Sequence, residues 1–407
     1  MSGLPEVLEG LDGELLDVDS HEMLPAELWV DAFGDIAAPV AQRFIESRSA
    51  DDPGYWSVPG CTADSAPVDP TTIWAAKGPT APGAIDPARR VEVIDAFGVR
   101  RQLMFPTSIG HCGAFISTYP AGAGQFDGVR FEHLAADRRS YAQRLFAAWN
   151  AWAAERAVGD DRIRPVFVLY GDTPRELIDT TERAIAAGAR ATVLLSGEPP
   201  AGRSPAHPDL DPFYELLAAN DVTLTVHLGS EGGFVASTTW RDAPAYDGFK
   251  VSGEFTGDPW TRASMHLAAQ NLTMTLITGG VFDRHPSLRF GVIELGAHWV
   301  GPLAELLDLW ADNTRSISRD AVRPSDLERR PSDYLRTNVR VTPFVFEPVG
   351  RYLDRYDLAD VLCFSTDYPH VEGGRDPVGV FAGELERHGS DVIEKFFVTN
   401  GRLLLPD

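Results

Sequence analysis

The sequence predicts a (β/α)8 barrel, and three observations carry this prediction. Short β-rich runs alternate with amphipathic, helix-like segments along most of the chain. There are about eight such runs, and the segments between them are long enough for parallel crossovers. The first run leads into DVDSHEMLP, which has a carboxylate and an imidazole where a doubly wound sheet would have a glycine-rich phosphate loop. A barrel therefore fits better than an open sheet.

The expected strands are rich in aliphatic and β-branched residues. In chain order they cover residues 14–19, 101–106, 166–170, 191–195, 222–227, 288–295, 338–342 and 360–366. Segment 88–100 is the helix expected before the second strand, with Gly98 near its C-terminal cap. The main irregular stretches cover about 48–88, 107–130, 197–210, 229–260 and 312–333. We expect one barrel domain over 1–407, with an insertion at about 48–88 and long loops that serve as lids, binding loops or subunit contacts.

The composition describes an acidic chain that is long enough to bury a full core. It has 407 residues, of which 44% are hydrophobic, and a formal net charge of -23. Phosphate binding needs clustered Lys and Arg, and no basic run occurs, so nucleic acid is not an expected partner. No apolar run approaches the roughly 20 residues that span a bilayer, so no membrane association is expected.

Cysteine and lysine usage bear on the compartment and on the metal count. Cys61, Cys112 and Cys363 are odd in number and widely spaced, which fits reduced thiols in the cytoplasm better than disulfides. The first residues lack the positive start and apolar centre of a secretory signal. None of the three lysines ends a strand-like run, so no residue is evident for a carbamylated lysine between two metals. This favours one metal ion over two.

Four expected strands end in residues that can ligate a metal. They are Asp19 and His21 in LLDVDSH, His227 in VTLTVHLG, Glu294 in RFGVIELG and Asp367 in LCFSTDYPH. In a parallel barrel the C-terminal ends of different strands converge on one face, so these side chains can meet at one metal ion. The pattern predicts a metalloenzyme.

Each of these residues also has a simpler interpretation. The Asp19–His21 segment could be a turn that caps a helix, and Asp367 could cap the proline turn that follows it. A lone strand histidine such as His227 is often a buried core residue. Glu294 is the most ambiguous, since it could ligate the metal, act as a general base, or orient His21 or His227.

Residues on the loops at the same end are candidates for substrate binding. His111 follows the second strand, on the face where the ligands converge, and could touch substrate. His370 lies on the loop after Asp367 and is either solvated, a supporting group or a substrate contact. Arg203 and Arg241 lie in the expected mouth loops and could grip a carboxylate, or could be surface charge.

These segments resemble the amidohydrolase-related barrels typified by aminocarboxymuconate-semialdehyde decarboxylase and γ-resorcylate decarboxylase. The resemblance covers most of the chain, and its specific motifs are the first, DVDSHEMLP, and the last, FSTDYPHVEGG. It implies metal ligation by Asp19, His21, His227 and Asp367. From the positions of the residues we also expect catalytic roles for Asp367, Glu294 and His227, and substrate contacts from His111, His370 and Arg241. The resemblance also implies one Zn²⁺ or Mn²⁺ ion and a homodimer or higher homo-oligomer.

The chain departs from those decarboxylases at the sixth strand, where Glu294 and Ala297 stand in place of the family's His and final Glu. The expected function is therefore metal-dependent decarboxylation of an aromatic or unsaturated acid, with two alternatives. One is a hydrolase or hydratase that activates a water on the metal. The other is an inactive barrel that serves as a binding or scaffold protein.

Overall fold

The structure, a computed structural model, describes residues 4–47, 56–61, 66–69, 72–118, 137–157, 159–234, 240, 243–246, 257–317 and 327–407. Its centre is a parallel sheet in which seven strands follow one another in chain order. They are β1 Leu15–Asp17, β2 Val99–Met104, β3 Ile163–Val168, β4 Ala191–Leu194, β5 Thr223–His227, β6 Phe290–Ile293 and β7 Val339–Val341. Every neighbouring pair is parallel, so each connection between them is a crossover.

Residues 361–368 close this sheet into a barrel. On one side the Cys363 N–H donates to Val341 O of β7 at 3.1 Å, and on the other the Val18 N–H donates to Phe364 O at 3.3 Å. Parallel bridges Val341–Leu362 and Ser20–Tyr368 complete the closure. The predicted (β/α)8 barrel is confirmed, and each predicted strand has its counterpart.

The eighth strand is less regular than the sequence predicts. Its Phe364 N–H donates at 3.0 Å to Phe396 O in the C-terminal helical region instead of to a neighbouring strand. This interrupts the ladder after the first bonds to β7, so residues 360–366 form only isolated bridges.

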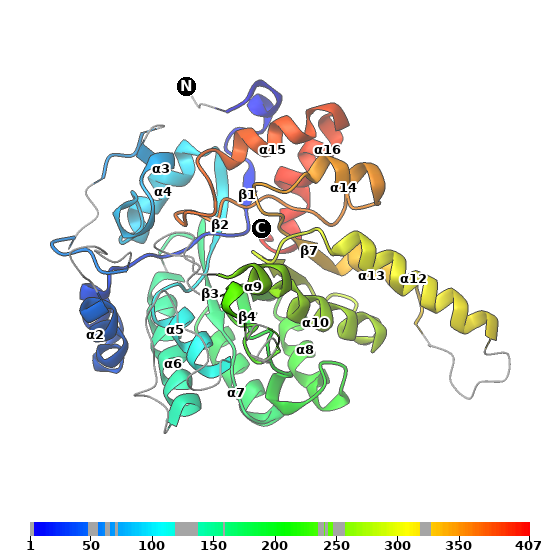
Figure 1. Cartoon of the computed structure of the whole chain (residues 1–407), viewed down its shortest axis with the longest axis horizontal. Coiled ribbons are helices and arrows are strands. Elements are labelled where there is room, and N and C mark those ends of the chain that lie inside the picture. Colours follow the sequence, from blue (N-terminus) through cyan, green and yellow to red (C-terminus); the bar gives the residue numbers. More distant parts are fainter. Residues whose placement is uncertain are drawn as a thin grey trace.

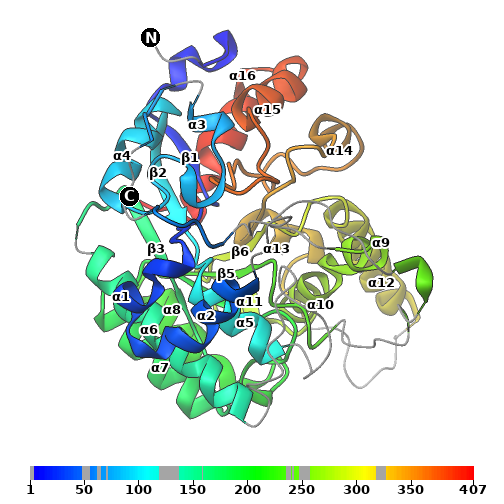
Figure 2. The same cartoon turned by 60° about the vertical axis from the view of Figure 1, so that its left-hand side comes forward.

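Helices surround the strands (Figures 1 and 2). Their bounds are α1 Trp29–Phe33, α2 Ala38–Ser47, α3 Thr72–Ala75, α4 Pro87–Ala96, α5 Ile109–Thr118, α6 Arg138–Ala157, α7 Pro174–Ala186, α8 Asp211–Ala219, α9 Pro259–Ser264, α10 His266–Thr278, α11 Val281–Arg284, α12 Val300–Ile317, α13 Pro331–Asn338, α14 Val349–Arg355, α15 Pro377–Leu385 and α16 Ser390–Glu394. Figure 1 shows α15 and α16 (red), which belong to the C-terminal part of the chain, beside β1 (blue), the first strand.

Local sequence explains where these helices start and stop. Helix α4 begins with Pro87, its Asp86 side chain accepts the Ala88 N–H, and the chain turns away at Gly98 with φ +71°. The predicted position of Gly98 near the C-terminal cap of this helix is therefore confirmed. Helix α7 begins with a capping box in which Thr173 and Glu176 each accept the other's backbone N–H.

The C-terminal segment forms the floor of the barrel. The Thr223 hydroxyl of β5 donates to Leu404 O at 3.0 Å, and a Cβ added at Gly291 of β6 would lie 3.0 Å from Leu404 Cδ1. Arg101 of β2 and Arg164 of β3 both donate to Pro406 O. The C-terminal segment thus bonds to β2, β3 and β5 at this end of the barrel.

A single domain with an insertion at about 48–88 stays a prediction, because residues 48–55, 62–65 and 70–71 lie outside the described residues. Among the helices that the structure does describe, none is long and apolar enough to cross a membrane.

Candidate metal centre

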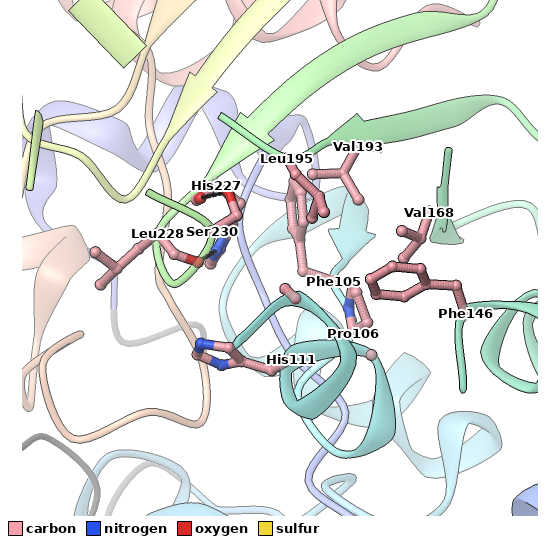
Figure 3. Close-up of a pocket in the computed structure, with 12 residues that line it drawn as sticks. Phe105, Pro106, His111, Phe146, Val168, Val193, Leu195, His227, Leu228 and Ser230 are labelled. Atoms are coloured by element: carbon pink, nitrogen blue, oxygen red, sulfur yellow. Dashed lines mark hydrogen bonds between the residues drawn. The ribbon is translucent and has the colours of Figure 1, made fainter. Parts of the chain in front are cut away.

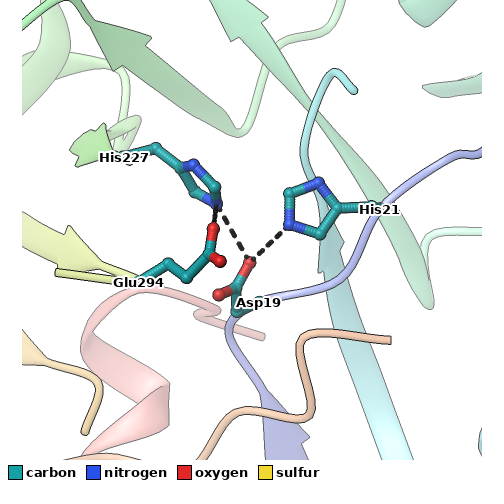
Figure 4. Close-up of side chains that lie close together, drawn as sticks. All are labelled: Asp19, His21, His227 and Glu294. Carbon is teal, nitrogen blue, oxygen red and sulfur yellow. Dashed lines mark hydrogen bonds and ion pairs between the residues drawn. The ribbon is translucent and has the colours of Figure 1, made fainter. Parts of the chain in front are cut away.

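Six side chains from different strand ends meet at the open mouth of the barrel, and Figure 4 shows four of them. Asp19 and His21 follow β1, His227 ends β5, Glu294 follows β6, Asp367 lies near the end of the closing segment and His370 follows that segment. They fall into two overlapping groups whose ligand atoms lie within 4.8 Å of one another. All six are buried. The convergence predicted for Asp19, His21, His227, Glu294 and Asp367 is therefore present.

The distances join these residues into one cluster. Asp19 Oδ1 lies 3.3 Å from both His21 Nε2 and His227 Nε2. His227 Nε2 lies 3.4 Å from Glu294 Oε2, and His21 Nε2 lies 3.4 Å from Asp367 Oδ1. Asp19 is thus central, with one histidine and one further carboxylate on each side.

Backbone conformation aims two of the carboxylates. Glu294 has φ +56° and Asp367 has φ +53°, in the left-handed region that non-glycine residues seldom adopt. The Glu294 N–H donates to the Thr342 hydroxyl at 2.9 Å, and the Asp367 N–H donates to Asp19 O at 2.9 Å. Such conformations cost about 1–3 kcal/mol each and concentrate at functional sites.

Hydrogen bonds fix the orientation of the histidine rings. His227 Nδ1 lies 3.1 Å from Leu228 O, which holds the Nδ1 proton and leaves the Nε2 lone pair facing the cluster. The Thr107 hydroxyl lies 2.7 Å from His21 Nδ1 and 3.4 Å from His370 Nε2. The rings of His21 and His370 stack with centroids 3.7 Å apart. Both imidazoles therefore depend on Thr107.

Asp17, two residues before Asp19, ties the first and last strands together beneath the cluster. Its carboxylate accepts the Thr366 N–H at 2.9 Å, the Thr366 hydroxyl at 2.6 Å and the Asp19 N–H at 3.2 Å. Gln102 donates to it as well. Burial raises the pKa of Asp17 to about 7, although these hydrogen bonds work in the opposite direction. Asp17 thus positions the backbone on both sides of the ligands.

Two further buried charges hold the loops that carry the site. Arg90 of α4 donates to His21 O at 2.6 Å and to Gly83 O at 2.9 Å. Glu22 accepts the Thr107 N–H at 3.1 Å and the Ser108 N–H at 2.8 Å. Sequence reasoning missed Asp17, Glu22 and Arg90, and the available signal was that Asp17 begins the DVDSH motif and Glu22 directly follows it.

The cluster fits a divalent cation. Asp19 Oδ2 is buried and makes no hydrogen bond among the described residues, and the contacts given for His21 Nε2 and Asp367 Oδ1 are with other members of the cluster. Burial raises the pKa of Asp367, but the charge of His370 and hydrogen bonds from His21 and His370 outweigh it and hold that pKa well below its usual range. Ionised carboxylates beside imidazole lone pairs are the donor set of Zn²⁺ or Mn²⁺ sites.

The predicted substrate-contact residues have different positions. His111 lies on α5, where its ring packs against the backbone of Gly229, and it lines a cavity together with His227 (Figure 3). Burial, followed by the nearby His227, His370 and His21, lowers the pKa of His111 well below its usual value, so the ring is neutral. His370 lies within the cluster itself. Arg241 lies outside the described residues.

Comparison with known proteins gives one family and one fold. The family model described as amidohydrolase matches residues 114–406. No curated protein sequence matches this chain. Among solved structures, an amidohydrolase from Mycobacterium avium subsp. paratuberculosis is similar with a TM-score of 0.65 and 21% identity, over 96% of this chain and 99% of that chain.

Two decarboxylases are also similar in structure. The 5-carboxyvanillate decarboxylase of Novosphingobium aromaticivorans, solved with bound manganese, has a TM-score of 0.56 and 16% identity over 97% of this chain and 98% of that chain. The 2,6-dihydroxybenzoate decarboxylase of Rhizobium has a TM-score of 0.53 and 17% identity over 96% of this chain and 98% of that chain. At these identities the similarity shows the fold alone.

Proposed function

This chain belongs to the amidohydrolase family, and from that premise we propose that it is a metal-dependent carboxy-lyase acting on an aromatic or unsaturated carboxylic acid. The observation that carries the proposal is the placement of Asp367 and Glu294, two carboxylates aimed by left-handed backbone into a cluster with His21 and His227. A decarboxylase needs a metal-binding donor set and a proton donor at one place, and this cluster offers both.

Asp19, His21, His227 and Asp367 are the residues we propose as ligands for one Mn²⁺ or Zn²⁺ ion. When bound, such an ion supplies Lewis-acid stabilisation of negative charge, worth several kcal/mol in general. Manganese suits the carboxylate oxygens and zinc suits the two imidazoles.

The chain's own residues would handle the proton. In decarboxylation the bond from carbon to the carboxylate breaks, carbon dioxide leaves, and a proton takes its place on carbon. We assign relay of that proton to Asp367, which is ionised at rest and would receive the proton from His370, whose Nδ1 lies 3.0 Å from Asp367 Oδ1, before passing it to carbon. His370 Nε2 lies 3.4 Å from the Thr107 hydroxyl, so a chain of exchangeable protons leads to Asp367. Glu294, on the other side of Asp19, would orient His227.

Hydrolysis or hydration is the second candidate, and the charge of one cavity favours it. A small cavity on the Glu294 side of the cluster is lined by Asp19, Glu294, Asp367 and Glu372 and by no Arg or Lys among the described residues. Four carboxylates repel a substrate anion and would suit a neutral substrate, with Glu294 or Asp367 as general base. The scaffold alternative is weaker, because a barrel without catalysis has no need for a buried ligand atom that lacks a hydrogen bond, as Asp19 Oδ2 does among the described residues.

The test begins with elemental analysis of the purified full chain and of Asp367→Asn, with Asp357→Asn as the control. Asp357 is an exposed carboxylate ten residues before Asp367, and it pairs with Arg336. We expect about one zinc or manganese ion per chain in the wild type and the control, and less in Asp367→Asn. No metal in folded wild-type protein, even after Mn²⁺ or Zn²⁺ is added, would overturn the proposal.

The loaded protein is then incubated with aromatic and unsaturated acids in ¹⁸O-labelled water. Carbon dioxide release with no label in the organic product supports the lyase. A labelled hydroxyl or carboxyl oxygen in the product, without carbon dioxide, supports hydrolysis or hydration instead.

We also propose a cytoplasmic homodimer. All three cysteines are free thiols in the structure, as a reducing compartment would keep them. Leu306, Leu309 and Trp310 are exposed on α12, which extends away from the barrel in Figure 1, and such residues are common at subunit contacts. Sedimentation equilibrium tests the dimer, and a monomer at micromolar concentration would contradict it.

A further inference from the structure

A second cavity lies on the other side of His227 from the acidic one. It lies between the ends of β2 to β5 and helices α5 and α6 (Figure 3). Its walls include Phe105, Phe146, Val168, Val193 and Leu195. His227 belongs to both this cavity and the metal cluster, so a ligand bound at the cluster can extend directly into the apolar space.

The polar groups of this apolar cavity already have partners. The Ser230 hydroxyl donates to His227 O at 3.1 Å and accepts the Ser196 N–H at 3.0 Å. His227 Nδ1 lies 3.1 Å from Leu228 O, while Nε2 faces the cluster. His111 stands on α5 against Gly229, across the opening from Ser230 in Figure 3. The inner wall formed by Val168, Val193 and Leu195 carries no polar side chain.

The two cavities therefore differ in what they accept. A hydroxyl or charge pushed against the valine and leucine wall would be buried without a hydrogen bond, which is unfavourable. The acidic cavity, lined by Asp19, Glu294, Asp367 and Glu372, would repel an anion but accept hydrogen bonds. A ligand that reaches both the cluster and the apolar cavity must be polar at one end and apolar at the other.

We propose that the substrate is a monocarboxylic acid whose uncharged, apolar end, a ring or hydrocarbon chain without a distal hydroxyl, occupies the cavity walled by Val168, Val193 and Leu195. The carboxylate lies at the metal cluster. The carboxylate's position rests on the proposed function, whereas the apolar end rests on the cavity alone. Val168, Val193 and Leu195 are then the residues that select against a distal polar group.

The experiment measures binding by calorimetry on the full chain loaded with Mn²⁺, with no turnover required. The probes are benzoate, 4-methylbenzoate and 4-hydroxybenzoate, which differ only at the position farthest from the carboxylate. We expect 4-methylbenzoate to bind at least as tightly as benzoate, and 4-hydroxybenzoate about 10- to 100-fold more weakly than 4-methylbenzoate. Equal affinity for the methyl and hydroxyl probes, or no binding of any of the three, would overturn the inference.

A variant places a hydroxyl in the wall. Val193→Thr adds a hydroxyl of nearly the same size, and it should reduce the preference for the methyl probe about tenfold. Val168→Thr tests the same wall from β3 if the first variant fails to fold. The control is Val226→Thr on β5, an equally buried valine that does not line the cavity and should keep the wild-type preference. A preference that neither wall variant reduces would count against the assignment.

The same samples separate this inference from the proposed function. A methyl-over-hydroxyl preference that the wall variants reduce, with no carbon dioxide release from any acid, would remove the lyase and leave the cavity assignment standing. If carbon dioxide is released, but the hydroxylated and methylated acids bind with equal affinities, the lyase stands and the cavity assignment is removed.

Discussion

The mouth of the barrel and its floor both bury charged side chains, but they hold them differently. At the mouth, three carboxylates and three histidines crowd together, and Asp19 Oδ2 makes no hydrogen bond among the described residues. At the floor, Arg101 and Arg164 are equally buried, and both donate to the same backbone oxygen, that of Pro406. Arg164 donates to Asp161 O as well.

The difference distinguishes charge that serves function from charge that serves structure. Floor guanidinium groups bond the C-terminal segment to β2 and β3, so their burial joins parts of the chain. Mouth carboxylates repel one another, and two of them, Glu294 and Asp367, have left-handed backbone, which destabilises the metal-free protein. Removing a mouth residue should therefore change metal binding more than stability, and removing a floor residue should do the opposite.

The largest expected effect is at the mouth. His227→Ala removes an imidazole from the centre of the cluster and should weaken Mn²⁺ or Zn²⁺ binding by more than about 100-fold, beyond what losing a supporting partner costs. The metal-free variant should unfold within a few degrees of the metal-free wild type, and only the rise in Tm on metal addition should vanish. Metal titration followed by thermal unfolding measures both quantities.

His207→Ala is the matched control, because His207 is exposed and far from the cluster in sequence. Unchanged metal affinity in His227→Ala would show that the cluster is not the metal site.

Asp17→Asn should have the next largest effect. Asp17 touches no substrate and acts through the backbone of Asp19 and Thr366, so its loss should weaken metal binding about 10- to 100-fold. The electron paramagnetic resonance spectrum of bound Mn²⁺ should change as well, because the ligands shift. A variant that loses stability but keeps both the affinity and the spectrum would assign Asp17 to the fold alone.

At the floor, Arg164→Met tests the other half of the comparison. Burial and the neighbouring Arg101 lower the pKa of Arg164 to about 10, so the side chain is still charged at neutral pH. Losing its bonds to Pro406 O and Asp161 O should lower the free energy of unfolding by about 1–3 kcal/mol. Urea unfolding measures this, and metal content per folded chain should stay at the wild-type value. Loss of metal from folded Arg164→Met would contradict the conclusion that floor residues affect stability and not metal binding.

The smallest effect is expected at the rim of the mouth, where α10 begins. The His266 ring meets His298 at 4.5 Å, and His298 Nδ1 lies 3.5 Å from Glu347 Oε1. Burial, followed by the charge of His298, lowers the pKa of His266 to about 4. The folded state therefore binds this proton less readily than the unfolded state. The resulting stability is present above about pH 6.5 and is lost as the pH falls toward 4.

His266 is only partly buried, so the loss should stay below about 1 kcal/mol. His266→Phe should flatten the acid side of the stability profile by that amount. An unchanged profile between pH 6.5 and 4 would show that His266 does not contribute.

The sequence predicted the strands and the convergence of five side chains because both depend on local pattern and on one rule of barrel geometry. A strand can be recognised in the sequence by its β-branched residues, and in a parallel barrel the C-terminal end of every strand lies at the mouth. Asp19, His21, His227, Glu294 and Asp367 could therefore be placed together without any knowledge of their contacts.

The supporting residues could not be predicted in this way, since their roles depend on contacts between distant segments. Glu22 bonds backbone N–H groups 85 and 86 residues away, and Arg90 reaches Tyr368 O across 278 residues. No periodicity in the sequence reports such contacts. The left-handed backbone of Glu294 and Asp367 is equally invisible, because neither is a glycine or an asparagine.

The closure of the barrel by residues 361–368 has a consequence for biosynthesis. Thr366 bonds to Asp19 O across 347 residues, so the metal cluster unites the first strand made with the last. A nascent chain with seven strands exposes two sheet edges and lacks Asp367 and His370. The six-residue cluster is therefore complete only after the eighth segment has left the ribosome and docked between β7 and β1.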